Sequence, residues 1–107
     1  VLEDTGQAAR QDEATAIDQS IEMLEKAQAA GARSRESIEA LFYLRRLWSL
    51  LIADLAKPEN DLPDSLRADL ISIGMWIMRQ AEIIRTGTSE DFKGMIDVSR
   101  SLVAGLK

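Results

Sequence analysis

Pairs of acidic residues are the side chains in this chain whose types and spacing could support chemistry. They occur as Asp12 with Glu13, Glu22 with Glu25, and Glu90 with Asp91. Two neighbouring carboxylates can serve as a general acid–base couple or can hold a divalent cation. Here each pair falls on a polar helix face, without aromatic shielding or a glycine-rich loop. We therefore interpret all three pairs as solvated surface.

Histidine and cysteine are both absent from the 107 residues. Catalytic triads, cysteine nucleophiles, zinc sites with histidine or thiolate ligands, and disulfides are therefore excluded. The run Gly87-Thr88-Ser89 is too short to cradle a phosphate group and lacks the lysine of a P-loop, so it is better interpreted as a helix end followed by a helix start. We expect no catalytic residue, no metal, no cofactor and no enzymatic activity.

The length fits one helical domain over residues 1–107, and the net charge of −5 bears on its partners. Proteins that grip phosphate backbones rely on clustered lysine and arginine, so we expect no direct contact with nucleic acid. Arg45-Arg46 and the pair Arg33 with Arg35 are the basic exceptions. Each pair sits near acidic residues, and solvated helix surface is a simpler interpretation than a nucleic-acid patch.

No secretory signal and no membrane-spanning run is visible, since the richest apolar run, from Leu47 to Leu55, is interrupted by Asp54. We therefore expect no membrane insertion. The lack of cysteine fits a reducing cytoplasm, which is the location we expect. The chain opens at Val1 rather than at a methionine, so we expect the native protein to begin upstream and the N-terminus to be truncated.

Apolar periodicity and capping residues predict four helices and no strand. They are expected to run from about Thr5 to Ala30, from Ser34 to Ala56 or Lys57, from Pro63 to Thr86, and from Thr88 or Ser89 to Gly105. Short connections favour antiparallel neighbours. The predicted fold class is therefore all-α, a small antiparallel bundle of four helices that is monomeric when free.

The second helix is expected to be the centre of this bundle. At 100° per residue its apolar side chains cover roughly 220° of the circumference, with Leu50 and Tyr43 outside even that arc. The residues within the arc are Ile38, Leu41, Phe42, Leu44, Leu47, Trp48, Leu51, Ile52 and Leu55. Arg45 also falls inside it and would either extend its charge to the edge or pair with a carboxylate such as Asp69.

The outer helices are simpler. The first has a thin apolar stripe, so we expect it to be the most loosely docked; the stripe consists of Ala14, Ile17, Ile21 and Leu24, followed by Gln28. The fourth is amphipathic, and Thr88 with Asp91 has the spacing of a capping-box variant.

The third helix has more apolar surface than an outer helix of a small bundle needs. Its core stripe is Leu66, Leu70, Ile73, Ile77, Ala81 and Ile84, and Gly74 indicates a close approach of another helix. Two further stripes are Ile71, Met75 and Met78, and Trp76 with Ile83. Exposed apolar stripes on soluble proteins often mark partner sites. These five residues are the predicted partner-binding residues, with the methionine stripe slightly favoured because thioethers adapt to different surfaces.

The central part of the chain resembles the FlaF family of bacterial flagellar proteins, and the resemblance extends over essentially the whole chain. The residues that carry it are Arg46-Leu47-Trp48, Asp54-Leu55, Pro58-Glu59-Asn60, Leu62-Pro63, Leu66-Arg67, Leu70-Ile71-Ser72-Ile73-Gly74 and Trp76, with Phe92-Lys93-Gly94 and Ile96-Asp97. This resemblance implies a flagellar assembly factor needed for the production and export of flagellin.

Three functions are compatible with this resemblance and with the residues. The first is a secretion chaperone that binds an amphipathic terminal helix of flagellin in the cytoplasm, with another flagellar regulator or the export apparatus as a further partner. The second is a post-transcriptional regulator of flagellin expression that acts through a protein partner or messenger RNA. The third is a structural subunit that oligomerises through its apolar faces. The absence of basic and aromatic nucleic-acid platforms favours the first.

Overall fold

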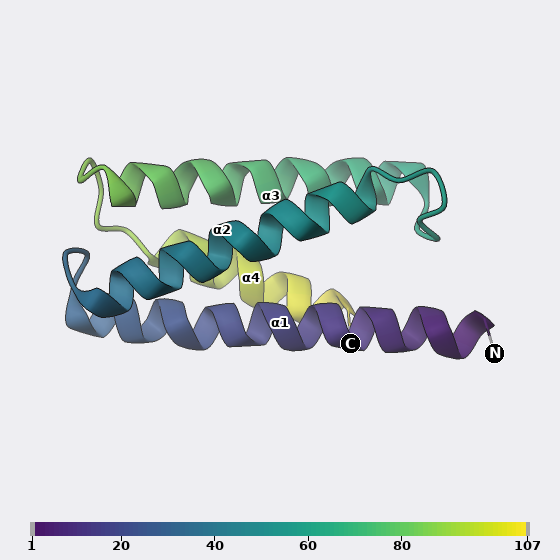
Figure 1. Ribbon diagram of the computed structural model, residues 1–107, viewed down its shortest axis with the longest axis horizontal. Coiled ribbons are helices and arrows are strands. Elements are labelled where there is room, and N and C mark those ends of the chain that lie inside the picture. Colours follow the sequence, from purple (N-terminus) through teal and green to yellow (C-terminus); the bar gives the residue numbers. More distant parts are fainter. Residues whose placement is uncertain (1, 107) are drawn as a thin grey trace.

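The computed structural model describes residues 2–106, with side chains from residue 9 onward, and these residues form four helices and no strand. The helices are α1 (Leu2–Ala30), α2 (Arg35–Leu55), α3 (Asp64–Arg85) and α4 (Lys93–Leu106). Successive helices run in opposite directions along a molecule measuring 45 × 20 × 19 Å (Figure 1). The predicted antiparallel four-helix bundle is confirmed.

Helix α2 is the centre of the bundle, as expected. It crosses between α1 and α3, while α4 packs against α1 and lies behind α2 in the view of Figure 1. The buried side of α2 carries Ser37, Ala40, Leu41, Leu44, Trp48 and Leu55. Trp48 is the largest side chain in the core and is 1% exposed. Burial of this one helix face therefore joins α2 to its neighbours.

Helix α1 is docked more firmly than its thin apolar stripe predicts. From Ala14 onward it packs against both α2 and α4, and Leu24 is completely buried. The stripe ends on Ala27, which is buried, whereas Gln28 is exposed. The expectation of loose docking is therefore wrong for this part of α1, because its narrow apolar stripe is buried against two helices at once.

Local capping residues explain where α1 and α3 end and where α2 and α3 begin. Ser34 caps α2, and its hydroxyl oxygen accepts a hydrogen bond of 3.1 Å from the backbone N–H of Ser37. Gly31 and Gly87 follow α1 and α3 with φ values of 105° and 88°, a left-handed conformation that glycine adopts without strain. Pro63 is the N-cap of α3, so this helix begins one residue later than predicted.

Helix α4 begins at Lys93, several residues after the predicted start at Thr88 or Ser89. Instead of a capping box, Ser89 Oγ accepts from the backbone N–H of Asp91, and the Asp91 carboxylate accepts from that of Lys93, both at 3.0 Å. Phe92 is 2% exposed and is inserted into the core. A non-helical segment advances about twice as far per residue as a helix, which lets this connection reach the far side of the bundle.

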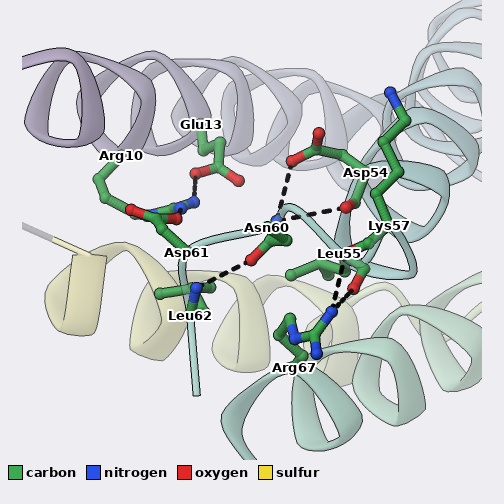
Figure 2. Close-up of polar contacts among 9 residues, drawn as sticks. All are labelled: Arg10, Glu13, Asp54, Leu55, Lys57, Asn60, Asp61, Leu62 and Arg67. Carbon is green, nitrogen blue, oxygen red and sulfur yellow. Dashed lines mark hydrogen bonds and ion pairs between the residues drawn. The ribbon is translucent and has the colours of Figure 1, made fainter. Parts of the chain in front are cut away.

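Asn60 organises the connection between α2 and α3 (Figure 2). Its amide nitrogen donates to the carbonyl oxygen of Asp54 at 3.2 Å and to the Asp54 carboxylate at 3.1 Å. Its amide oxygen accepts from the backbone N–H of Leu62 at 3.0 Å. The Asn60 side chain therefore joins the end of α2 to the segment before α3.

Arg67 closes the same end of α2 from the first turns of α3 (Figure 2). Its Nη1 donates to the carbonyl oxygens of Leu55 and Lys57 at 3.1 and 2.9 Å. The last carbonyls of a helix have no partners within the helix and attract positive charge. Arg67 and Asn60, two of the residues that carry the family resemblance, thus have structural roles here.

Arg10 of α1 reaches the same connection and forms ion pairs with Glu13 and Asp61. Burial raises the pKa of the Glu13 carboxyl above its ordinary value, and the charge and hydrogen bond of Arg10 only partly oppose this effect. The α2–α3 connection is therefore tied to the N-terminal half of the molecule as well as to its own helices (Figure 2).

Candidate helix-docking surface

Three large apolar side chains of α2 point to solvent, although the sequence predicts that neighbouring helices cover most of them. Ile38 is 68% exposed, and Phe42 and Leu50 are each 65% exposed. At 100° per residue Phe42 lies roughly 120° around the helix from Trp48. Among residues 2–106 no helix covers the side of α2 that faces the viewer in Figure 1. We call these three residues the α2 apolar face.

A hollow of about 350 Å³ lies on one side of this face, between α2 and α3. We call it the α2–α3 hollow; its lining residues are Ala32, Arg33, Ser37, Ile38, Leu41, Phe42, Arg45, Met78, Ala81, Glu82 and Arg85. Buried Ala32, Leu41 and Ala81 contribute to this lining. Because two of them are alanines, the helices leave an apolar depression there.

A second hollow of about 620 Å³ lies on the other side, between α1 and α2. We call it the α1–α2 hollow; its lining residues are Ala16, Met23, Glu39, Phe42, Tyr43, Arg46, Leu47 and Leu50. Phe42 lines both hollows and forms the ridge between them. A partner seated in either hollow would therefore contact the same aromatic side chain.

Two arginines lie among the apolar side chains of this surface. Arg45 lines the α2–α3 hollow and Arg46 the α1–α2 hollow. Within the described part of the chain, neither guanidinium group has an ion pair or hydrogen bond. The structure therefore gives Arg45 an exposed position rather than a pair with Asp69.

Arg45 acts at a distance on the carboxylate of Glu82, across the α2–α3 hollow. Arg85 donates two hydrogen bonds to this carboxylate, from Nε at 2.8 Å and from Nη2 at 2.5 Å. These hydrogen bonds lower the pKa of Glu82, with smaller contributions from the charges of Arg85 and Arg45. The Glu82 charge is thus already satisfied by Arg85, and Arg45 remains available to another anion.

The five residues predicted to bind a partner fall into different environments. Met78 lines the α2–α3 hollow, and Met75 is 50% exposed on the outside of α3. Ile71 and Ile83 are half-buried. Trp76 lies against Gly94 of α4. A Cβ atom added to Gly94 would be 3.4 Å from Cη2 of Trp76. Only Met78 therefore joins the surface described above, and a binding role for the five residues stays a prediction.

The exposure of the α2 apolar face could have been inferred from the sequence, although apolar periodicity alone does not predict it. The apolar arc of α2 is wider than two neighbouring helices can cover, and Leu50 lies outside it altogether. Arg45 and Arg46 stand in the middle of this surplus, where a buried helix face would not place two charges. An exposed apolar face that contains two charged side chains is the arrangement that satisfies all three observations.

The described residues show no alternative site of a chemical kind. The described side chains, those of residues 9–106, include no group of three or more acidic residues placed to hold a metal ion. No helix in this part of the chain is both long and apolar enough to cross a bilayer. The α2 apolar face and the two hollows beside it therefore form the candidate site.

Comparison with known protein families gives a match over residues 1–106 to the family described as flagellar protein FlaF. The chain belongs to the FlaF family. Neither a comparison with curated proteins nor one with solved structures gives a match. The resemblance noted from the sequence is thus confirmed, and it places this FlaF family member among flagellar proteins.

Proposed function

We propose that this FlaF family member is a non-catalytic flagellar assembly factor that binds flagellin in the cytoplasm before export. The observation that carries the proposal is the α2 apolar face, left open in a protein of a flagellar family. Three large apolar side chains on one helix face are more than a small soluble protein needs to expose, and such patches commonly mark binding surfaces.

The shape of the surface fits a helical partner. Phe42 stands between two hollows, one bounded by α2 and α3 and the other by α1 and α2. An amphipathic helix laid into either hollow would bury its own apolar side chains together with Phe42, Ile38 or Leu50. The family resemblance implies an amphipathic terminal helix of flagellin as the partner, and covering such a helix would keep the subunit soluble until export. Such binding requires apolar contact and no cofactor.

A post-transcriptional regulator of flagellin expression is the second candidate, acting through a protein partner or through messenger RNA. The exposed guanidinium groups of Arg45 and Arg46 are the observation that favours contact with an anion. The exposed ring of Phe42 beside these arginines differs from the sequence-based expectation that no aromatic platform is exposed. A protein is still favoured over an RNA, because two guanidinium groups on a chain of net charge −5 are few positive charges for holding a phosphate backbone.

Methyl NMR of the four methionines tests the proposal, since the methionines report on different parts of the surface. Met23 lines the α1–α2 hollow, Met78 the α2–α3 hollow, and Met75 the exposed side of α3. Met95 is 1% exposed and reports on the core. The chain labelled at the methionine methyl groups would be titrated with monomeric flagellin, and light scattering would give the mass of the complex.

We expect the signals of Met23, Met78 or both to shift on addition of flagellin, with an unchanged Met95 and a one-to-one mass. Shifts of Met75 without Met23 would move the site to the stripe predicted on α3. If no signal moves and the mass stays that of the free chain, flagellin is not the partner. Micromolar RNA binding that weakens steeply with salt would instead favour the regulator.

A further inference from the structure

We propose that the α2–α3 hollow is the anchoring subsite of the docking surface and that it takes an apolar side chain flanked by a carboxylate on the partner helix. This proposal deepens the proposed function by assigning the chemistry of the bound segment. The partner's identity rests on the proposed function, whereas the chemistry of the subsite can be tested with synthetic helices.

The apolar part of the subsite comes from α2, α3 and the turn before α2. Ala32, Leu41 and Ala81 are buried, and partly buried Met78 provides a flexible thioether. Ile38 and Phe42 extend this apolar surface to the solvent side. A leucine-sized side chain entering here would contact residues of both helices and shield Phe42 from water.

The charged part of the subsite is opposite in sign to the rest of the chain. Its lining contains Arg33, Arg45 and Arg85 against Glu82, which gives +3 − 1 = +2, whereas the whole chain carries −5. Arg85 is engaged with Glu82, and Arg33 donates to the carbonyl oxygen of Ile84. Arg45 is therefore the cation that remains for a carboxylate of the partner.

The α1–α2 hollow lacks this charge imbalance. Its lining contains one cation, Arg46, and one anion, Glu39. Glu39 is paired with Arg35 at 2.9 Å. A partner helix spanning both hollows would therefore find a nearly neutral apolar surface on the α1 side and a cationic edge on the α3 side. This difference also orients the partner across the ridge formed by Phe42.

The same charges disfavour a second copy of this chain as the occupant. Arg45 and Arg46 lie between Ile38 and Leu50, near the middle of the α2 apolar face. A two-fold pairing of two such faces would bring four guanidinium groups close to the symmetry axis. Their mutual repulsion opposes self-association, whereas a helix with flanking carboxylates replaces repulsion by attraction.

The test uses two synthetic helical peptides that share one leucine stripe, with glutamate flanking the stripe in one and lysine in the other. Each would be titrated into methionine-labelled protein at low salt while the Met78 signal is followed. The titration would be repeated with Arg45→Glu and with the matched control Arg79→Glu, which changes the same charge on an exposed position of α3 outside both hollows. Circular dichroism would check that both variants fold.

We expect the glutamate peptide to shift the Met78 signal and to bind about fivefold more tightly than the lysine peptide, given the modest strength of exposed ion pairs. The preference should vanish or reverse in Arg45→Glu and persist in Arg79→Glu. Equal binding of both peptides, an unmoved Met78 signal, or a doubled mass without peptide would each overturn the proposal. If flagellin binds while the peptides show no preference, only the subsite fails; if the preference holds without flagellin binding, only the flagellin assignment fails.

Discussion

The indole ring of Trp48 lies directly against Gly74, so that α2 and α3 approach each other closely at this point. A Cβ atom on Gly74 would lie 2.5 Å from Trp48 Cε3 and 2.9 Å from Cζ3. It would also approach Ile52 Cδ1 to 3.2 Å. The close approach that the mid-helix glycine indicates is therefore confirmed, and its partner is the largest side chain of the core.

Gly74→Ala should destabilise the protein although alanine is the better helix former. The added methyl group meets a rigid ring that is itself buried, and such overpacking costs about 1–3 kcal/mol. The gain in helix propensity offsets about 1 kcal/mol of this. Urea unfolding should show a net loss of up to about 2 kcal/mol in the free energy of unfolding. A gain in stability would mean that the Trp48 ring has room to move.

Ser99→Ala should stabilise the protein by about 1 kcal/mol, because it removes a buried hydroxyl that has no partner. Ser99 is completely buried, and its Oγ has no hydrogen-bond partner in the structure. Ser20→Ala is the matched control, since Ser20 Oγ is buried but donates to the carbonyl oxygen of Ile17 at 2.6 Å. Thermal unfolding of the two variants should separate them, and equal effects would contradict this account.

Phe42→Ala should weaken flagellin binding at least tenfold while changing the free energy of unfolding by no more than about 0.5 kcal/mol. The side chain is 65% exposed in the free protein and forms the ridge shared by both hollows. Met75→Ala, at a half-exposed position of α3, is the control. Isothermal titration calorimetry and urea unfolding supply the two readouts. Loss of binding in Met75→Ala but not in Phe42→Ala would transfer the site to α3.

Glu13 should make the stability of the protein fall as pH rises. Burial raises its pKa in the folded state above the ordinary 4.5, so the folded state holds this proton more tightly than the unfolded state. The contribution is complete below the ordinary pKa and is lost as pH rises through the folded-state value. The free energy of unfolding of the wild type minus that of Glu13→Gln should therefore decrease as pH rises above about 4.

Arg10→Gln should increase the pH dependence of the effect of Glu13→Gln. Arg10 lowers the pKa of Glu13 through its charge and its hydrogen bond, so its removal leaves burial less opposed. Measured in this background, the effect of Glu13→Gln should vary more strongly with pH. A difference between wild type and Glu13→Gln that grows as pH rises would contradict the assigned direction of the shift.

Much of the fold was predictable because it depends on interactions between residues close in sequence. Ser34, Gly31 and Gly87 act within a single turn, and the apolar spacing of α2 and α3 follows from helix geometry. The late start of α4 was not predictable in this way. Phe92 is held in the core by helices distant in sequence, and its burial outweighs the local capping preference of Thr88 and Asp91.

The sequence by itself determined the helices, their antiparallel order, the family and the absence of histidine and cysteine chemistry. Only the tertiary structure decided which surplus apolar residues stay open, because this depends on how α4 is placed. Helix α4 lies behind α2 and leaves Phe42 exposed, while Trp76 of α3 is drawn toward Gly94. Apolar periodicity predicts which face of a helix is apolar. It does not predict which other helices pack against that face, because those helices come from distant parts of the chain.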